Sequence, residues 1–236
     1  MSSEAQKNRY SVFLSIMVWG TLWGIFEATV GYLLHLLPFS VSWLIMYPAA
    51  CFFMANVYRK TNRVSSVWLV GILCASVKLL NLFLPGRVDR VINPAISIVF
   101  EALTMAAAIF VLNRLPGEAH GNPWIKALVA LGMNTGWRLL FILYLLFLVP
   151  GWIREVSVVS SMEKFIPFFV TQNLLSSLLL YLGYQFKDLI LRRVEGAERK
   201  MTAIGADNMP IRVKPILKTG AVVLMLGINV VLELLL

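Results

Sequence analysis

The sequence predicts an all-α, polytopic membrane helix bundle, a single integral domain over residues 1–236 with six or seven transmembrane helices. Hydrophobic residues make up 59% of the chain and charged residues 14%, whereas soluble domains average roughly 45–50% and about 25%. The mean hydropathy is +0.78. The apolar residues gather in runs close to or above the roughly 20 residues that a spanning helix needs. Together these observations exclude an ordinary soluble globule, a disordered chain and a disulfide scaffold.

Seven apolar segments fill most of the chain, each bounded by charged residues, proline or glycine. The first follows Lys7 and Arg9, as a signal peptide would, but it is too long for a signal h-region and lacks a small-x-small cleavage site, so we expect a retained helix. A cytoplasmic link over residues 187–215 begins as a charged helix extension and then contains Gly, Asn and Pro. The predicted helices cover residues 10–37, 40–57, 64–84, 94–112, 125–149, 165–186 and 216–236.

The basic residues predict the orientation in the membrane. The chain carries 21 Lys and Arg against 12 Asp and Glu, a net charge of +9. With the N-terminus in the cytoplasm, most of the Lys and Arg fall in inside loops, as the positive-inside rule requires. Only four then lie in outside loops: Arg87, Arg90, Arg154 and Lys164. We therefore expect a multi-pass protein of the cytoplasmic (inner) cell membrane, in contact with the lipid bilayer and not with nucleic acid.

The main functional signal is a set of four charged side chains inside four separate predicted spans: Glu27, Lys78, Glu101 and Arg138. Each costs about 2.5–3.5 kcal/mol at the bilayer centre on insertion scales. Helix rise places all four between the midplane and the outer leaflet. Asn134 shares a helical face with Arg138, and Gln172 lies in another predicted span at a depth similar to theirs. The predicted substrate-binding residues of an outward-facing polar pocket are Glu27, Lys78, Glu101, Asn134, Arg138 and Gln172. The alternative is a structural network of closed ion pairs that locks the bundle.

A ridge of small residues marks the first predicted helix. Gly20, Gly24 and Ala28 repeat every four residues in WGTLWGIFEATVG. Such a small-xxx-small surface lets another helix approach closely. The pattern predicts a helix contact, either as a docking surface for a partner protein or as packing within the same chain.

Absent motifs narrow the function. The chain has no GxxxxGK[ST] loop for ATP, no HExxH, no GxSxG and no CxxC, and its two histidines are scattered. Cys51 and Cys74 lie in apolar runs and are expected to be core residues. We therefore predict no enzyme activity, no catalytic residues, no metal site and no cofactor.

An N-inside bundle with an outward polar pocket and no ATP machinery resembles the substrate-binding (S) component of an energy-coupling-factor (ECF) vitamin or micronutrient transporter. The resemblance covers size, helix count and the ridge, where Gly20, Gly24 and Ala28 match that family's Ala-x-x-x-Ala docking pattern with glycine at two positions. It implies binding of a small polar substrate at the outer face, with a transmembrane coupling protein and ATPase subunits as partners. The predicted seventh helix, 216–236, departs from the family's usual six.

Three other functions fit the same residues. An ion-coupled secondary transporter would use Glu27 or Glu101 as its coupling group. An intramembrane enzyme acting on a lipid-linked substrate would use a buried glutamate as general base, with Arg138 holding a phosphate or carboxylate. A structural subunit of a membrane complex would use the small-residue ridge and the basic loops for assembly.

Overall fold

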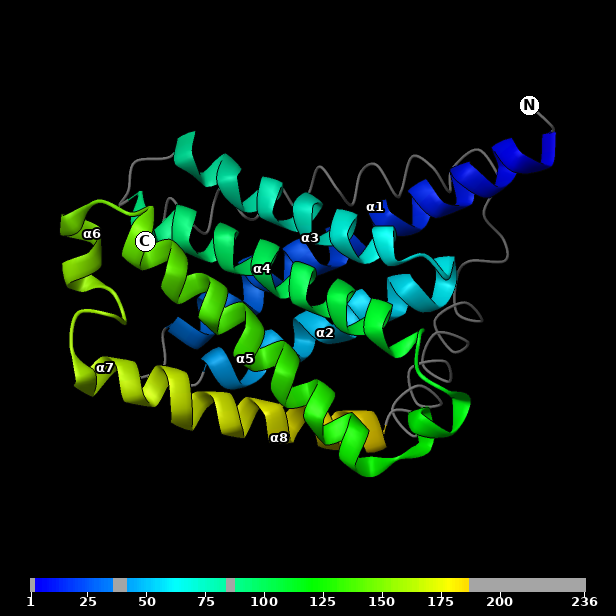
Figure 1. The fold of residues 1–236 in the computed structure, drawn as a ribbon. Coiled ribbons are helices and arrows are strands. Elements are labelled where there is room, and N and C mark those ends of the chain that lie inside the picture. The colour runs from blue at the N-terminus through cyan, green and yellow to red at the C-terminus, as the bar shows by residue number, and fades with distance from the viewer. Residues whose placement is uncertain (1–2, 36–41, 84–87, 187–236) are drawn as a thin grey trace.

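The computed structural model describes residues 3–35, 42–83 and 88–186, and within these ranges every regular element is helical (Figure 1). The predicted seventh helix, 216–236, and the predicted cytoplasmic link, 187–215, lie outside the described residues. The elements are α1 Ser3–His35, α2 Ser42–Thr61, α3 Val64–Leu79, η1 Leu80–Phe83, α4 Asp89–Leu112, η2 Gly117–Gly121, α5 Pro123–Phe147, α6 Gly151–Val156, α7 Met162–Ile166, η3 Pro167–Thr171 and α8 Gln172–Gln185.

Four helical segments in the described part of the chain are long and apolar enough to cross a membrane. Helix α3 is apolar but has 16 residues, and the 3₁₀ turn η1 continues it as far as Phe83. The prediction of an all-α membrane protein is therefore confirmed at this level, whereas the number of spans and the orientation stay predictions. The four segments are Arg9–Glu27, Asp89–Leu112, Pro123–Phe147 and Met162–Gln185.

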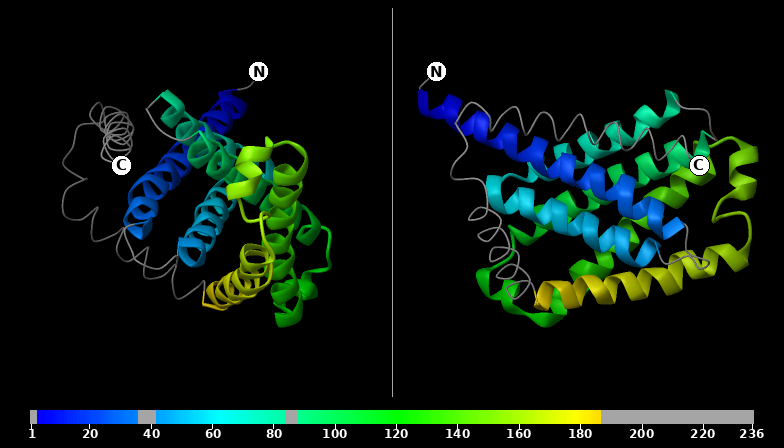
Figure 2. Two further views of the ribbon diagram at one scale, coloured as in Figure 1. Left: turned by 90° about the vertical axis from the view of Figure 1, so that its left-hand side faces the viewer. Right: turned by 180° about the vertical axis from the view of Figure 1, so that it is seen from behind.

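Helix α2 occupies the middle of the bundle. It contacts α1, α3, α4 and α8, while α1 packs on α3, α3 on α4, α4 on α5, and α5 on α8. Figures 1 and 2 place α2 between α1 and α8 in views from opposite sides. The short helix α6 joins the end of α5 to α7 (Figure 1). This order brings α2, α4, α5 and α8 together around one interior region.

In the described part of the chain, Pro94 lies inside α4 and Pro48 inside α2. We predicted a helix start at Pro94, but α4 begins five residues earlier, at Asp89. Pro94 is the sixth residue of α4, beyond the first four N–H groups that have no partner within a helix, so it removes one backbone hydrogen bond. Pro48 lies within α2 in the same way, near its first turns. The structure thus differs from the predicted start at Pro94, because α4 continues through the proline at the cost of a single hydrogen bond.

Local chemistry sets the other helix ends. Asn122 caps α5, where its side-chain oxygen accepts the Trp124 N–H at 2.9 Å and Pro123 follows at the first helical position. Helix α2 ends at Thr61 because Asn62 adopts a left-handed backbone conformation with φ of 50°. The Asn62 N–H still donates to the Tyr58 carbonyl at 2.7 Å. The Asn62 turn then leads directly into α3.

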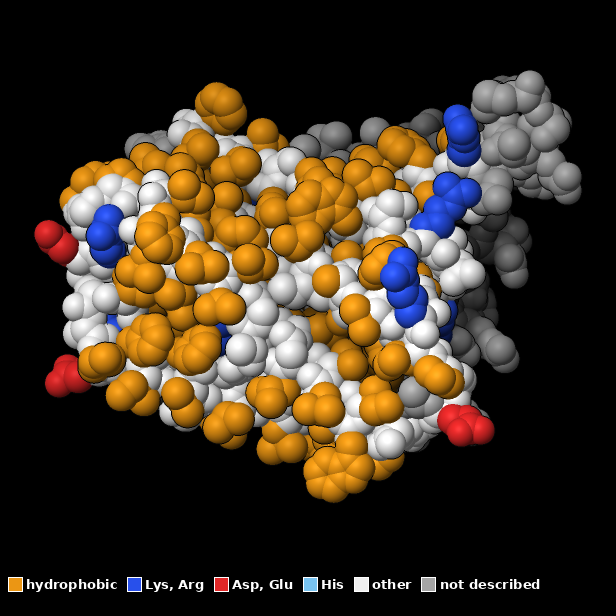
Figure 3. All heavy atoms as spheres, in the orientation of Figure 1, with side chains coloured by type: hydrophobic (Ala, Val, Ile, Leu, Met, Phe, Trp, Pro, Cys, Tyr) orange, Lys and Arg blue, Asp and Glu red, His pale blue; other side chains and the backbone are white. Residues whose placement is uncertain are grey.

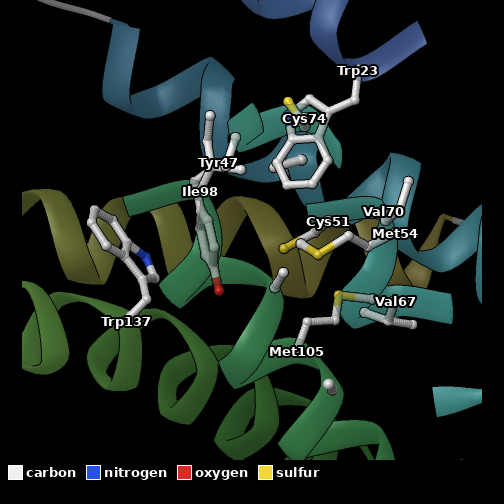
Figure 4. Close-up of a cluster of buried hydrophobic side chains, with 14 of the residues drawn as sticks. Trp23, Tyr47, Cys51, Met54, Val67, Val70, Cys74, Ile98, Met105 and Trp137 are labelled. Carbon is white, nitrogen blue, oxygen red and sulfur yellow. The ribbon is translucent and has the colours of Figure 1, made fainter. Parts of the chain in front are cut away.

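The bundle buries a core of aromatic and sulfur-containing side chains. Trp23, Tyr47, Cys51, Met54 and Trp137 belong to one buried cluster that extends across α1, α2 and α5 (Figure 4). Figure 3 shows that hydrophobic side chains also cover most of one outer face, with charged side chains toward its two ends. On α8 the exposed leucines are Leu174, Leu175, Leu178, Leu179 and Leu182. An apolar surface with charges at its ends is the distribution expected of helices that face lipid.

Candidate functional site

Helix α5 carries the polar centre of the bundle. Asn134 and Arg138 are four residues apart, so they share one face of the helix, and both are completely buried at 0% exposure. A fully buried arginine is rare in any protein, and each of its donors needs a partner. The arrangement around these two side chains therefore defines the candidate site.

Asn134 connects α5 to α8. Its Nδ2 donates to the Asn173 carbonyl oxygen at 2.7 Å and to Ser177 Oγ at 3.1 Å. Its Oδ1 accepts from Trp137 Nε1 at 2.8 Å and from Arg138 Nε at 3.3 Å. All of the hydrogen-bonding groups of this side chain are thus engaged. Asn134 fixes both the indole and one edge of the guanidinium.

Arg138 is held by α5 and by the helical segment opposite. Its Nη1 donates to the Phe168 carbonyl oxygen at 2.7 Å and reaches Gln172 Oε1 at 3.5 Å. The guanidinium carbon lies 4.6 Å from the ring centroids of both Trp137 and Phe168. Cation–π contacts of this kind gain strength when the cation is desolvated. The predicted residues Asn134, Arg138 and Gln172 therefore do meet at one place.

A π-helical segment supplies the Phe168 carbonyl. Within η3 the Gln172 N–H donates to the carbonyl of Pro167, five residues back, instead of the usual four. This shift changes the register of the backbone hydrogen bonds. The Phe168 carbonyl oxygen, which an α-helix would pair with the Gln172 N–H, accepts from Arg138 instead. Single π turns occur often at functional sites.

Two buried donors in this region make no hydrogen bond within 3.5 Å among the described residues: Arg138 Nη2 and Tyr47 Oη, the latter close to Cys51 and Thr104. The Tyr47 ring packs on Trp137 with centroids 5.5 Å apart, and Figure 4 shows the two side chains next to each other. Arg138 lies over the same indole. Sequence reasoning missed Tyr47, whose only signal was a hydroxyl in the middle of an apolar helix.

Glu101 projects from α4 into the same region. It is 8% exposed and lies within electrostatic range of Arg138, Tyr47 and Glu27. Among the described residues its carboxylate makes no ion pair within 4.0 Å and accepts no hydrogen bond. The predicted alternative of a closed Glu101–Arg138 ion pair is therefore not formed in this structure. Glu101 on α4 and Arg138 on α5 therefore interact electrostatically without forming an ion pair.

The other two predicted charged residues are Glu27 on α1 and Lys78 on α3. The Glu27 carboxylate accepts a hydrogen bond from Trp23 Nε1 at 3.1 Å and lies within electrostatic range of Lys78. Both side chains are half-buried, and no ion pair within 4.0 Å joins them in the described part of the chain. Electrostatic interactions thus connect Lys78 on α3 with Glu27 on α1, Glu27 with Glu101 on α4, and Glu101 with Arg138 on α5. Only Arg138 directly contacts the predicted Asn134 and Gln172.

At Gly20 the small-residue ridge of α1 packs against another helix of the same chain. Gly20 is buried, and a Cβ atom there would lie 2.6 Å from Leu73 Cδ2 and 3.2 Å from Val70 Cγ2, both on α3. Gly24 is buried as well, and Ala28 falls outside the described side chains. The close approach that Gly20 permits is therefore made by α3 of the same chain, which was the intramolecular alternative.

The described residues include no group of three or more His, Cys, Asp or Glu side chains that could hold a metal ion. Cys51 and Cys74 are free thiols buried in the core. No protein family, curated protein or solved structure matches this chain. The geometry around Arg138 is therefore the main indication of function in this protein.

Proposed function

We propose that this protein is a membrane-embedded substrate-binding component of a transporter that takes up a small polar molecule. The observation that carries the proposal is Arg138 Nη2, a fully buried donor without a partner on a guanidinium whose other atoms are fixed. A buried, unpaired donor costs about 1–3 kcal/mol, and more when the group is charged. A ligand oxygen that accepts from this atom would remove that penalty.

The residues around Arg138 would orient it for binding. Asn134 and the Phe168 carbonyl hold two of its nitrogens, while Trp137 and Phe168 hold its plane. A side chain fixed in this way loses little conformational entropy when a ligand binds. Glu101 and Gln172 would complete the polar lining, as predicted, and Tyr47 would add a second donor. In this proposal Glu27 and Lys78 lie at the edge of the site.

Separate subunits would supply the energy. The sequence contains no GxxxxGK[ST] loop, so ATP hydrolysis would come from ATPase subunits acting through a transmembrane coupling protein. Cytoplasmic placement of the N-terminus and access from the outer face follow from the distribution of Lys and Arg. Because α3 covers Gly20, a coupling protein would dock elsewhere or displace that contact.

Native mass spectrometry of the gently purified full chain tests the proposal. Wild-type protein is expected to retain a small molecule that Arg138→Gln releases. Arg154→Gln, an exposed arginine on α6, is the matched control and should retain it. Equal retention by Arg138→Gln and wild type would show that the molecule binds elsewhere and would overturn the assignment. Co-purification of an ATPase pair would support the coupling mechanism.

A second candidate is an ion-coupled secondary transporter. The observation that favours it is the pair of carboxylates Glu27 and Glu101, which come from α1 and α4 and lie within electrostatic range of each other. Intramembrane carboxylates that interact often carry protons or cations. Uptake into liposomes driven by an imposed proton or sodium gradient, without any ATPase and lost in Glu27→Gln, would favour this function over the first.

A further inference from the structure

Basic side chains are distributed unevenly between the two ends of the bundle. Helices α2 and α4 end, and α3 and α5 begin, at the end where α1 starts (Figure 1). Among the described side chains, Glu118 is the only exposed carboxylate at this end. The opposite end mixes both signs, with Arg90, Arg154 and Lys164 beside Asp89, Glu155 and Glu163. The basic side chains described at the first end are Arg9, Arg59, Lys60, Arg63, Arg114 and Lys126.

Four of these cations come together where α2 and α4 end, and we call them the basic rim: Arg59, Lys60, Arg63 and Arg114. The first two lie on the last turn of α2, and Arg63 is the N-cap of α3. Two hydrogen bonds tie the end of α4 to the end of α2. Asn113 Nδ2 donates to Tyr58 Oη at 2.9 Å, and Tyr58 Oη donates to Asn113 Oδ1 at 3.2 Å. Arg114, the next residue, is therefore held at the same end as the other three.

Aromatic rings support two cations of the basic rim. Lys60 Nζ lies 5.4 Å from the ring centroid of Trp19, and the Arg114 guanidinium carbon lies 4.3 Å from that of Phe110. Both cations are exposed, and neither forms an ion pair within 4.0 Å with a described residue. A ring attracts a cation without neutralising its charge. Both charges therefore stay available to an anionic partner.

Exposed apolar side chains accompany the basic rim. Phe110 is 50% exposed, and Trp124, on the first turn of α5, is 77% exposed. Exposed aromatic rings beside Lys and Arg are typical of the level at which a membrane meets water. A soluble phosphate compound would use the cations alone. A phospholipid uses both, because its headgroup meets the cations while its glycerol and upper acyl chains meet the rings.

We propose that the basic rim binds the headgroups of anionic phospholipids. The four cations attract the negatively charged headgroup, and Phe110 and Trp124 contact the lipid below it. Each Lys or Arg near a membrane surface strengthens binding to anionic lipid about fivefold. A phosphatidylcholine headgroup carries the same phosphate, but its own cationic group offsets that charge. The basic rim therefore selects lipid by headgroup charge, independently of what binds at Arg138.

Competition between two lipids tests the proposal. The full chain is purified in mild detergent and mixed with equimolar phosphatidylglycerol and phosphatidylcholine that have the same acyl chains. Native mass spectrometry then measures which lipid is retained. We expect at least a tenfold preference for phosphatidylglycerol that falls as the salt concentration rises, because exposed charges are screened. Equal retention of the two lipids would overturn the inference and would point to an acidic protein surface as the partner.

Two triple variants locate the bound lipid. Lys60→Gln, Arg63→Gln and Arg114→Gln together should reduce the preference at least tenfold. Arg59 is left in place because its Nη2 donates to Asn56 Oδ1 at 3.1 Å within the protein. The matched control removes three cations from the opposite end, by Arg90→Gln, Arg154→Gln and Lys164→Gln, and should keep the preference. Equal losses in the two triple variants would show that only the net charge matters and would refute the assignment.

Two further arms separate lipid binding from misfolding and from phosphate binding. Lys60→Arg, Arg63→Lys and Arg114→Lys together conserve every charge, so this variant should retain phosphatidylglycerol as the wild type does. Loss of the preference in this variant, with the folded fraction unchanged, would contradict recognition by charge. Millimolar inorganic phosphate should leave the bound lipid in place. Its complete displacement by phosphate would show a site for a soluble phosphate and would overturn the lipid assignment.

Discussion

Asn134→Ala is the substitution whose effect can be worked most fully from the structure. The Asn134 side chain makes four hydrogen bonds at once: two as donor to α8 and two as acceptor from its own helix. Alanine removes all four. It leaves Trp137 Nε1 and Arg138 Nε, both buried, without their acceptor. The substitution therefore tests whether this network holds α5 against α8.

The magnitude follows from bond energies measured inside membranes. Hydrogen bonds between transmembrane helices average about 0.6 kcal/mol and reach about 1.7 kcal/mol. The two bonds to α8 give about 1.2 kcal/mol at this average, and the buried Trp137 donor and charged Arg138 donor left without an acceptor raise the total by about 1–3 kcal/mol each. Asn173→Ala removes a donor bond to Thr135 Oγ1 on α5 and an acceptor bond from Ser177 on its own helix, so it should cost about 0.6–1.2 kcal/mol. Its backbone carbonyl still accepts from Asn134.

The assay is reversible unfolding of the purified full chain by SDS in mixed micelles, followed by tryptophan fluorescence. Trp137 reports on the site directly, because its Nε1 donates to Asn134. We expect the loss in free energy of unfolding to be largest for Asn134→Ala and smaller for Asn173→Ala. Ser160→Ala is the control: its hydroxyl is exposed and accepts a hydrogen bond from Lys164 Nζ at 3.1 Å, away from Asn134.

The order of the three variants is the decisive result. Asn134→Ala costing less than about 0.5 kcal/mol would refute the reasoning, because one average membrane hydrogen bond already exceeds that value. A loss for Asn173→Ala equal to that for Asn134→Ala would also refute it. The centre of the network would then lie on α8 and not on α5.

Three further substitutions can be measured in the same way. Gly71→Ala should cost about 1–3 kcal/mol, because the new Cβ would lie only 2.2 Å from Ala102 Cβ and force α3 away from α4; no loss there would mean that the helices pack less closely. Gly132→Ala is its control and should stabilise by up to about 1 kcal/mol, since nothing lies within 4 Å. Gly20→Ala should cost less than Gly71→Ala, because the flexible end of a leucine can move, and the reverse order would contradict this. Tyr47→Phe should leave the stability of the unliganded protein unchanged or raise it by about 1 kcal/mol, because the hydroxyl makes no hydrogen bond within 3.5 Å; a clear loss would reveal a bond to the nearby Cys51 or Thr104.

Part of the candidate site could be predicted because helical periodicity is a local property. The spacing of Asn134 and Arg138 places both on one face of α5 whatever the rest of the chain does. Their depth in an apolar run marks them as costly and therefore as functional candidates. Gln172 was found by the same argument, and it contacts Arg138 at 3.5 Å.

Other members of the site could not be found in this way. Tyr47 matters because the Trp137 ring, 90 positions later in the chain, lies beside it. The Phe168 carbonyl is a backbone atom, and only the register shift in η3 presents it to Arg138. Neither property is visible in residue types or in their spacing. Both depend on how helices that are distant in sequence pack together.

By itself the sequence determined that this protein is helical and suited to a membrane, and which helices carry charge within their apolar length. The reason is that solvation and helix periodicity act over a few turns of chain. Only the tertiary structure decided that Gly20 packs on α3 and that Asn134 joins α5 to α8. It also decided that Glu101 and Arg138 come within electrostatic range without forming an ion pair. These outcomes depend on distances between separate helices, and such distances are fixed by packing of the whole bundle.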